Sequence, residues 1–164
     1  MTEVPANGYS PFGMEIENKN ALGIYSAALY GYNHSLATAT AQNAAYQEIG
    51  YDGFEEKGNG NSTAYVSCGH IDLKHSTHKP NAAAPLIVNE AHTGKYALSY
   101  MGIDGDSLYL DVPVRNSVEQ FSTWNRLQFV KGKSYTISFW FKVATGNTSD
   151  YWYLLARNKN AGVN

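Results

Sequence analysis

The nine residues Tyr135-Thr136-Ile137-Ser138-Phe139-Trp140-Phe141-Lys142-Val143 carry the clearest structural signal in this chain. Apolar side chains recur at every second position, among them Ile137, Phe139 and Phe141, and Trp140 lies on the opposite face. Because successive side chains of a β-strand point to opposite faces of the sheet, this alternation is typical of a strand with one buried face. The stretch therefore predicts a strand whose odd-numbered side chains line the core of a sheet protein.

Weaker strand patterns surround this one. They fall at 63–68, 96–100, 107–114 and 151–156, with turns rich in Gly and Asn between them. Several short strands separated by such turns are typical of antiparallel sandwiches. The chain is therefore expected to be mainly β, with an antiparallel β-sandwich of the jelly-roll kind.

The first fifty residues differ from the rest because Ala and Tyr are dense there. Ser35 is a favourable N-cap, which predicts one helix over 36–49. Residues 20–32 fit either a second short helix or an extended arm, because glycines interrupt both patterns. Residues 1–50 are accordingly expected to form a linker-like, partly helical segment, and residues 51–164 the β-sandwich domain.

The composition restricts the partners. Hydrophobic residues make up 43% of the 164 residues, which is enough for a core, whereas charged residues make up only 16% and the net charge is −2. No run of Lys and Arg is present that could release counterions from a phosphate backbone, so nucleic acid is not an expected partner. The longest apolar stretches are far shorter than the roughly 20 residues of a membrane helix, so membrane insertion is not expected.

Cysteine usage and the two ends of the sequence bear on the compartment. The single cysteine, Cys68, excludes an intrachain disulfide, which fits an exported bacterial protein better than a disulfide-stapled animal domain. The N-terminus shows no basic region followed by an apolar one, so an exported chain would be an internal fragment. Residues 158–164 look like a turn after a strand, which predicts a sandwich truncated at its C-terminus. Its exposed sheet edges would favour a homo-oligomer or strand exchange.

Three pieces of sequence, in order, carry a resemblance to a known family. They are Gly53-Phe54-Glu55-Glu56, then Ala91-His92-Thr93-Gly94-Lys95-Tyr96-Ala97-Leu98, then Lys131-Gly132-Lys133-Ser134-Tyr135-Thr136-Ile137-Ser138-Phe139-Trp140-Phe141-Lys142. Their order resembles carbohydrate-binding modules of the cellulose- and xylan-binding kind, which share the galactose-binding-like jelly roll. The second and third pieces also suit the concanavalin-like jelly roll, which is the alternative fold.

That resemblance implies a cofactor. In such modules a carboxylate of the opening strand and backbone carbonyls of the second piece bind a structural calcium ion away from the sugar face. Carried over to this chain, the metal ligands would be Glu55 or Glu56 with the backbone near Thr93 and Lys95. Calcium takes about six to eight oxygen ligands, so further ligands would be required.

Residues 9–56 carry a second resemblance, to a segment of very large surface proteins of Bacteroidetes. Tyr9-Ser10-Pro11-Phe12-Gly13 and Glu17-Asn18-Lys19-Asn20-Ala21-Leu22 are similar to the end of a YD-repeat shell in those proteins. The resemblance implies export and a place in a large multidomain protein, and it implies no chemistry.

The aromatic residues are the main indication of function. Sugar rings stack on exposed aromatic planes, with polar side chains beside them to bond the hydroxyls. No pair of carboxylates facing across a cleft, no nucleophile elbow and no phosphate-binding glycine loop is visible, so no enzyme is predicted. The expected function is binding of a polysaccharide or other glycan by a secreted or cell-surface bacterial protein, and the alternative is a structural spacer or protein-interaction sandwich. The candidate ligand-binding residues are Trp124, Trp140, Trp152, Tyr109 and Tyr151.

Overall fold

The computed structural model describes residues 8–57, 63–64, 69–76, 84–100, 107–118 and 126–142. Within these ranges the regular structure is almost entirely β-strand, with two short 3₁₀ turns, η1 (Tyr46–Glu48) and η2 (Glu55–Lys57). The expected mainly β class is therefore confirmed. The described strands form small, separate sheets, and a two-layered sandwich is not seen among them. The same ranges contain no helix with the length and apolar character that a membrane crossing requires.

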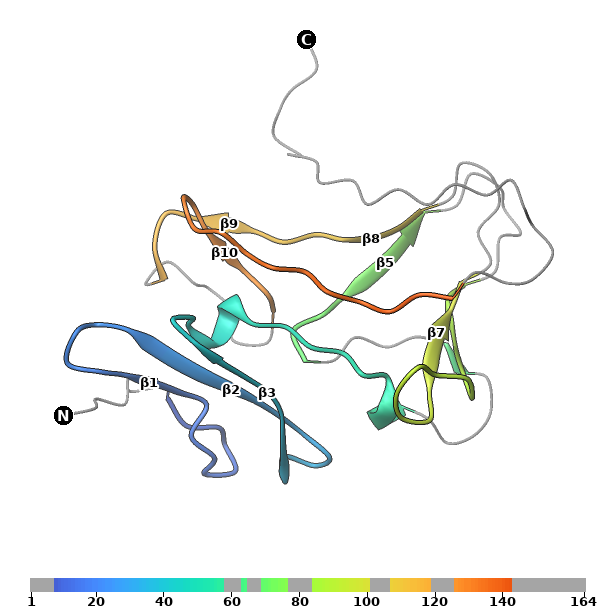
Figure 1. The fold of residues 1–164 in the computed structure, drawn as a ribbon, viewed down its shortest axis with the longest axis horizontal. Helices are drawn as coiled ribbons and strands as arrows, with labels where there is room; N and C mark the ends of the chain where they lie inside the picture. The colour runs from blue at the N-terminus through green and yellow to red at the C-terminus, as the bar shows by residue number, and fades with distance from the viewer. Residues whose placement is uncertain are drawn as a thin grey trace, which may run out of the picture.

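The N-terminal sheet contains three antiparallel strands, β1 (Glu17–Lys19), β2 (Tyr25–Gly31) and β3 (Leu36–Gln42). Figure 1 shows them side by side at one end of the molecule, with β2 in the centre. β2 buries Ala27 and Leu29 on one face and leaves the residues between them partly exposed. This period of two means that one face of the sheet packs on the protein and the other faces solvent.

The helix predicted over 36–49 is wrong, because β3 occupies the first half of that range and only η1 follows it. The alternation Ala37-Thr38-Ala39-Thr40-Ala41 has the period of a strand, and its β-branched threonines favour extended backbone. Ser35 does not cap a helix. Its hydroxyl donates to the Tyr32 carbonyl at 2.6 Å and closes the turn between β2 and β3.

The remaining described strands form three smaller sheets. β4 (Thr63–Ala64), β6 (Leu86–Val88) and β7 (Ala97–Ser99) pair in the order β4-β6-β7; β5 (Leu73–Ser76) pairs with β8 (Ser107–Leu110); β9 (Val114–Arg115) pairs with β10 (Phe129–Val130). The first two sheets are antiparallel, as predicted, whereas β9 and β10 are parallel. β5 lies in a polar stretch that carried no strand signal. The strand predicted at 151–156 lies outside the described residues.

The core is small and partly polar. Gln47 of η1 and Gln128 next to β10 are its most deeply buried large side chains, and the Gln128 N–H donates to the Gln47 carbonyl at 2.8 Å. This contact joins the first fifty residues to the later part of the chain. The buried apolar residues of the described ranges are Ile16, Ala27, Leu29, Ala45, Ile87, Tyr96, Leu127 and Val130.

Residues 133–142 form no assigned strand and belong to no described sheet, so the strand predicted over 135–143 is not found among its described residues. In Figure 1 this segment, orange to red, runs from β10 to the neighbourhood of β7. Ile137, Phe139 and Phe141 are 63%, 60% and 67% exposed. The prediction that these side chains line a core is therefore wrong. Burial of an alternating apolar face requires a second layer, and no described element covers this one.

Candidate functional site

The structure describes two of the five aromatic residues predicted to bind a ligand. Trp140 is 77% exposed on the extended segment after β10, and Tyr109 is exposed in β8. Trp124, Tyr151 and Trp152 lie outside the described residues. Both described side chains are therefore accessible to a ligand.

His92 covers one face of the Trp140 ring. The two rings are stacked, with centroids 3.9 Å apart and planes 6° from parallel. Close by, Lys142 Nζ lies 3.2 Å from Glu90 Oε2. These two contacts hold the extended segment against the turn that precedes β7 and orient the indole, whose high exposure leaves its other face to solvent.

The two carboxylates predicted as metal ligands, Glu55 and Glu56, contact different parts of the structure. Glu55 Oε1 accepts the backbone N–H groups of Lys95 and Tyr96 at 2.7 and 2.9 Å, which places this carboxylate on the turn at 93–95. The Glu56 carboxylate instead lies beside Gly31, at the end of β2. The structure thus brings Glu55, but not Glu56, to the second piece of the family resemblance.

The contact between Glu55 and the turn is made through N–H groups, which donate hydrogen bonds and cannot ligate a cation. Among the described residues, no group of three or more His, Cys, Asp or Glu side chains is arranged to hold a metal ion. In this geometry the Glu55 carboxylate stabilises the turn through two hydrogen bonds.

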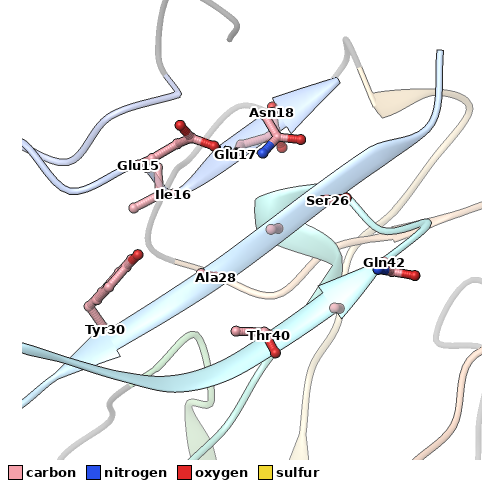
Figure 2. A pocket seen from close by; sticks show the side chains of 11 residues that line it. Glu15, Ile16, Glu17, Asn18, Ser26, Ala28, Tyr30, Thr40 and Gln42 are labelled. Carbon is pink, nitrogen blue, oxygen red and sulfur yellow. Dashed lines mark hydrogen bonds between the residues drawn. The ribbon is translucent and has the colours of Figure 1, made fainter. Parts of the chain in front are cut away.

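A shallow groove lies on the outer face of the N-terminal sheet (Figure 2), with a volume of about 510 Å³. The strand register builds it. Ser26 of β2 lies between Asn18 of β1 and Gln42 of β3, and Ala28 lies beside Thr40. The small side chains of Ser26 and Ala28 leave the space, because longer side chains at these positions would fill it.

Polar groups and one aromatic ring surround this floor. Tyr30 stands at one end of the groove, and Glu15 Oε1 accepts a hydrogen bond from Asn18 Nδ2 at 2.6 Å. Within the described part of the chain, no hydrogen bond engages the side chains of Thr40 and Gln42. The described lining offers hydroxyl, amide and carboxylate groups and contains no Lys or Arg. The lining can therefore both donate and accept hydrogen bonds.

Glu17 also lines the groove, but it is buried. Its Oε2 accepts the backbone N–H of Tyr46 at 2.6 Å. Burial raises the pKa of the Glu17 carboxyl above its usual value, the hydrogen bond from Tyr46 opposes this rise, and the negative charge of Glu48 adds to it. Glu17 therefore ties the sheet to η1 beneath the groove.

The buried carboxylate of Glu48 is the centre of a polar cluster that joins η1 to the residues after β10. Lys133 Nζ lies 2.8 Å from each carboxylate oxygen, and the Tyr135 hydroxyl donates to Oε1 at 2.6 Å. The Ala45 N–H donates to Oε2 at 2.9 Å. Burial, together with the hydrogen bond to Glu48, raises the pKa of Tyr135 to about 12. Both carboxylate oxygens are engaged, so this cluster is a structural link and not a ligand site.

Sequence reasoning missed the groove, because its residues become neighbours only through the register of three strands. A signal was present in β2, where Ser26, Ala28 and Tyr30 occupy alternate positions. That pattern marks a strand with small side chains and one aromatic ring on the same face. The interrupting glycines at 23 and 31 concealed it.

Comparisons of the chain with protein-family models, with curated proteins and with solved structures found no match.

Proposed function

We propose that this chain is a non-catalytic glycan-binding module of a secreted or cell-surface bacterial protein. The groove on the β1-β2-β3 sheet carries the proposal. Its floor of small side chains leaves room for a flat ring, and Tyr30 offers an aromatic surface at one end. Thr40 and Gln42 supply a hydroxyl and an amide that are free to bond sugar hydroxyls.

The lining favours a neutral glycan over other ligand classes. A phosphorylated or sulfated ligand would need Lys or Arg, which the described lining does not contain. A wholly apolar ligand would cover the Glu15 carboxylate and the Gln42 amide without bonding them, which is unfavourable. A pyranose has both an apolar C–H face and a polar rim, so it meets both requirements.

The predicted aromatic residues extend the proposal beyond the groove. Trp140 and Tyr109 are exposed, and an indole with one free face is a suitable platform for a sugar ring. With them we propose the finer fold, an antiparallel jelly-roll sandwich of the carbohydrate-binding type. Trp124, Tyr151 and Trp152 complete the proposed set of ligand-binding side chains.

A glycan array followed by isothermal titration calorimetry on the whole chain tests the function. Tyr30→Ala and Gln42→Ala are each expected to weaken binding by about tenfold, since each removes one contact worth roughly 1.4 kcal/mol. Phe12→Ala is the matched control, because Phe12 is an exposed aromatic residue outside the lining. A folded chain that binds no plant or bacterial glycan, or a Tyr30→Ala variant that binds like the wild type, would contradict the proposal.

The alternative function is a structural spacer or protein-interaction domain of a large surface protein. The exposed apolar side chains of Ile137, Phe139 and Phe141 favour it, because contiguous exposed apolar surface marks protein contacts more often than sugar contacts. It predicts that substitutions in the groove leave every glycan titration silent, while substitutions in the extended segment change association with protein.

Structural calcium at Glu55, Glu56, Thr93 and Lys95 stays a prediction from the family resemblance. If calcium binds the folded state only, the midpoint of thermal unfolding must rise with its concentration. Thermal unfolding in calcium, in magnesium and in chelator measures this directly. Identical midpoints in all three conditions would contradict the prediction.

A further inference from the structure

The loop between β6 and β7, residues 89–96, is long for a hairpin. Two antiparallel strands are most often joined by about two to five residues, and longer connections frequently carry function. Val88 and Ala97 are the last paired residues on either side of this loop. Within the described ranges, no backbone hydrogen bond joins residues 89–95 to one another. The shape of the loop therefore depends on contacts with side chains.

Glu55 of η2 makes such a contact at the C-terminal side of the loop, which lies beside η2 in Figure 1. Its Oε1 accepts the N–H groups of Lys95 and Tyr96 at 2.7 and 2.9 Å. Hydrogen bonds to a charged oxygen are stronger than neutral ones, and two of them fix the direction of consecutive peptide groups. Gly94 has a φ of +83°, and a Cβ there would overlap the Glu55 carboxylate. The loop is thus folded closely around this carboxylate.

The middle of the same loop holds the Trp140 ring. His92 stacks on the indole with centroids 3.9 Å apart and planes 6° from parallel. The Thr93 hydroxyl lies 2.8 Å from His92 Nδ1 and orients the imidazole. The neighbouring ion pair of Glu90 and Lys142 is exposed on both sides, so it contributes little. Among the described contacts, the stack on His92 is therefore the one that sets the direction of the indole.

We propose that Glu55 is a positioning residue for the Trp140 platform, the indole face that His92 leaves exposed. The carboxylate fixes the backbone at Lys95 and Tyr96, and this holds His92 a few residues earlier against the ring. A platform fixed before a ligand arrives loses less conformational entropy when the ligand binds. The inference rests on the proposed function only in treating Trp140 as a platform for a sugar ring. The coupling from Glu55 to Trp140 is a property of the folded chain without ligand.

Proton NMR of the His92 imidazole, recorded on the whole chain in chelator, measures this coupling without any glycan. Protons held above an aromatic ring resonate upfield of their usual position, so the stack displaces the His92 ring protons. Trp140→Ala should abolish the displacement, and His92→Gln identifies the resonance among the five histidines. Glu55→Ala is expected to remove most of the displacement, because the loop loses both hydrogen bonds that hold it.

Two variants separate positioning from a general effect of the substitution. Glu55→Gln keeps an oxygen that can accept both N–H groups, so it should retain most of the displacement. Glu56→Ala removes a neighbouring carboxylate that lies beside Gly31 instead of the loop, so it should leave the His92 resonance in place. A role of Glu55 in stability alone would lower the unfolding midpoint without moving a resonance of the folded state.

A Glu55→Ala variant with the wild-type His92 resonance would overturn the proposal, and so would a wild-type resonance that coincides with that of Trp140→Ala. Should Glu55→Ala fail to fold, Glu55→Asp supplies the test. It keeps the charge, but its side chain is one methylene shorter and is expected to lose the two hydrogen bonds and the displacement with them. Retention of the full displacement in Glu55→Asp would count against the proposal in the same way.

Calorimetry distinguishes this inference from the proposed function. With a glycan that binds at the platform, Glu55→Ala and Trp140→Ala should weaken binding by a similar factor, about tenfold for the loss of roughly 1.4 kcal/mol, and Glu55→Gln should not. A glycan that binds Trp140→Ala as tightly as the wild type would contradict the platform, which belongs to the proposed function. The NMR result decides the coupling in either case.

Discussion

A single buried carboxylate, Glu48, connects parts of the chain that are far apart in sequence. It accepts hydrogen bonds from the N–H of Ala45, from Lys133 and from Tyr135. A buried ion pair contributes little compared with apolar side chains of the same shape, but removing one partner leaves the others unpaired. Removal of the Glu48 charge is therefore expected to lower the stability of the whole fold.

Glu48→Gln is expected to lower the free energy of unfolding by about 2 kcal/mol, because the charge-assisted hydrogen bonds to Lys133 and Tyr135 are weakened. Urea denaturation measures this as a lower midpoint at unchanged slope. Glu90→Gln is the matched control, since it breaks the exposed pair with Lys142 and should cost at most about 1 kcal/mol. Equal losses in the two variants would contradict the assigned role of Glu48.

Burial of Glu17 makes the protein less stable as the pH rises, whereas most carboxylates that are paired in the native state make it less stable as the pH falls. Because burial raises its pKa, the native state takes up this proton at a higher pH than the unfolded chain does. Between the ordinary value of 4.5 and the raised native value, the native state binds more protons, so stability falls as the pH rises through that window.

Glu17→Gln removes the buried charge and keeps an oxygen for the Tyr46 N–H. The variant is expected to unfold at a higher urea concentration than the wild type at about pH 7, and the difference should shrink at about pH 4. Glu15→Gln controls for the change in net charge, since Glu15 is exposed. A difference between Glu17→Gln and the wild type that is the same at both pH values would count against burial as the cause.

The family resemblance placed Glu55 and the turn at 93–95 in the same predicted site, and in the structure they do lie together. The pair of Glu48 and Lys133 had no comparable signal. These residues are 85 positions apart; Glu48 stands in no motif, and the piece of the family resemblance that contains Lys133 implies no partner for it. Side chains joined by tertiary packing alone leave no periodicity in the sequence, so such a contact is invisible until the fold is known.

Among the elements, the hairpin of β2 and β3 shows how a local signal can mislead. Ser35 and Gly50 frame a stretch that suits a helix, and its alanines suit one as well. The alternating threonines favour a strand, and this strand pairs with the edge of β2. The local sequence of 36–49 does not show that this edge is available. The strand predicted over 135–143 is not found among its described residues, 135–142, and its apolar face is exposed, because strand pairing and burial both depend on what lies beside the segment in the fold.

The turn at Gly69 supports the path between the first sheet and β5. Its φ is +51°, and a Cβ at this position would overlap the Tyr51 carbonyl oxygen. Gly69→Ala is expected to lower the free energy of unfolding by about 3 kcal/mol or more. The added Cβ strains a backbone with positive φ, and it also forces the backbone of Tyr51 to move. Urea denaturation again provides the measurement.

Gly132 is the control for that substitution. It also has positive φ, +86°, but nothing lies within 4 Å of the added Cβ. Gly132→Ala is expected to cost only the backbone strain, about 1 kcal/mol. If both alanine variants lost the same stability, the close approach of Gly69 to Tyr51 would not be the cause.

At the scale of the whole molecule, the chain is a set of small sheets held by a partly polar core. Composition and alternation predicted the mainly β class, since both are averages over many residues. They could not predict that the described sheets stay separate or that β9 and β10 run parallel, because strand partners are chosen by the global fold. The groove depends on strand pairing in the same way, because its lining comes from three neighbouring strands.

The separation between Glu48 and Lys133 also has a consequence during synthesis. The hairpin of β2 and β3 and the carboxylate behind it leave the ribosome 85 residues before the cation that neutralises it. At about 5–20 residues per second, this delay is roughly 4–17 s. During that time the nascent hairpin must keep Glu48 in water and cannot dock, so ribosome-bound chains arrested before residue 133 should leave the first sheet open to protease, and chains arrested well beyond it should protect it.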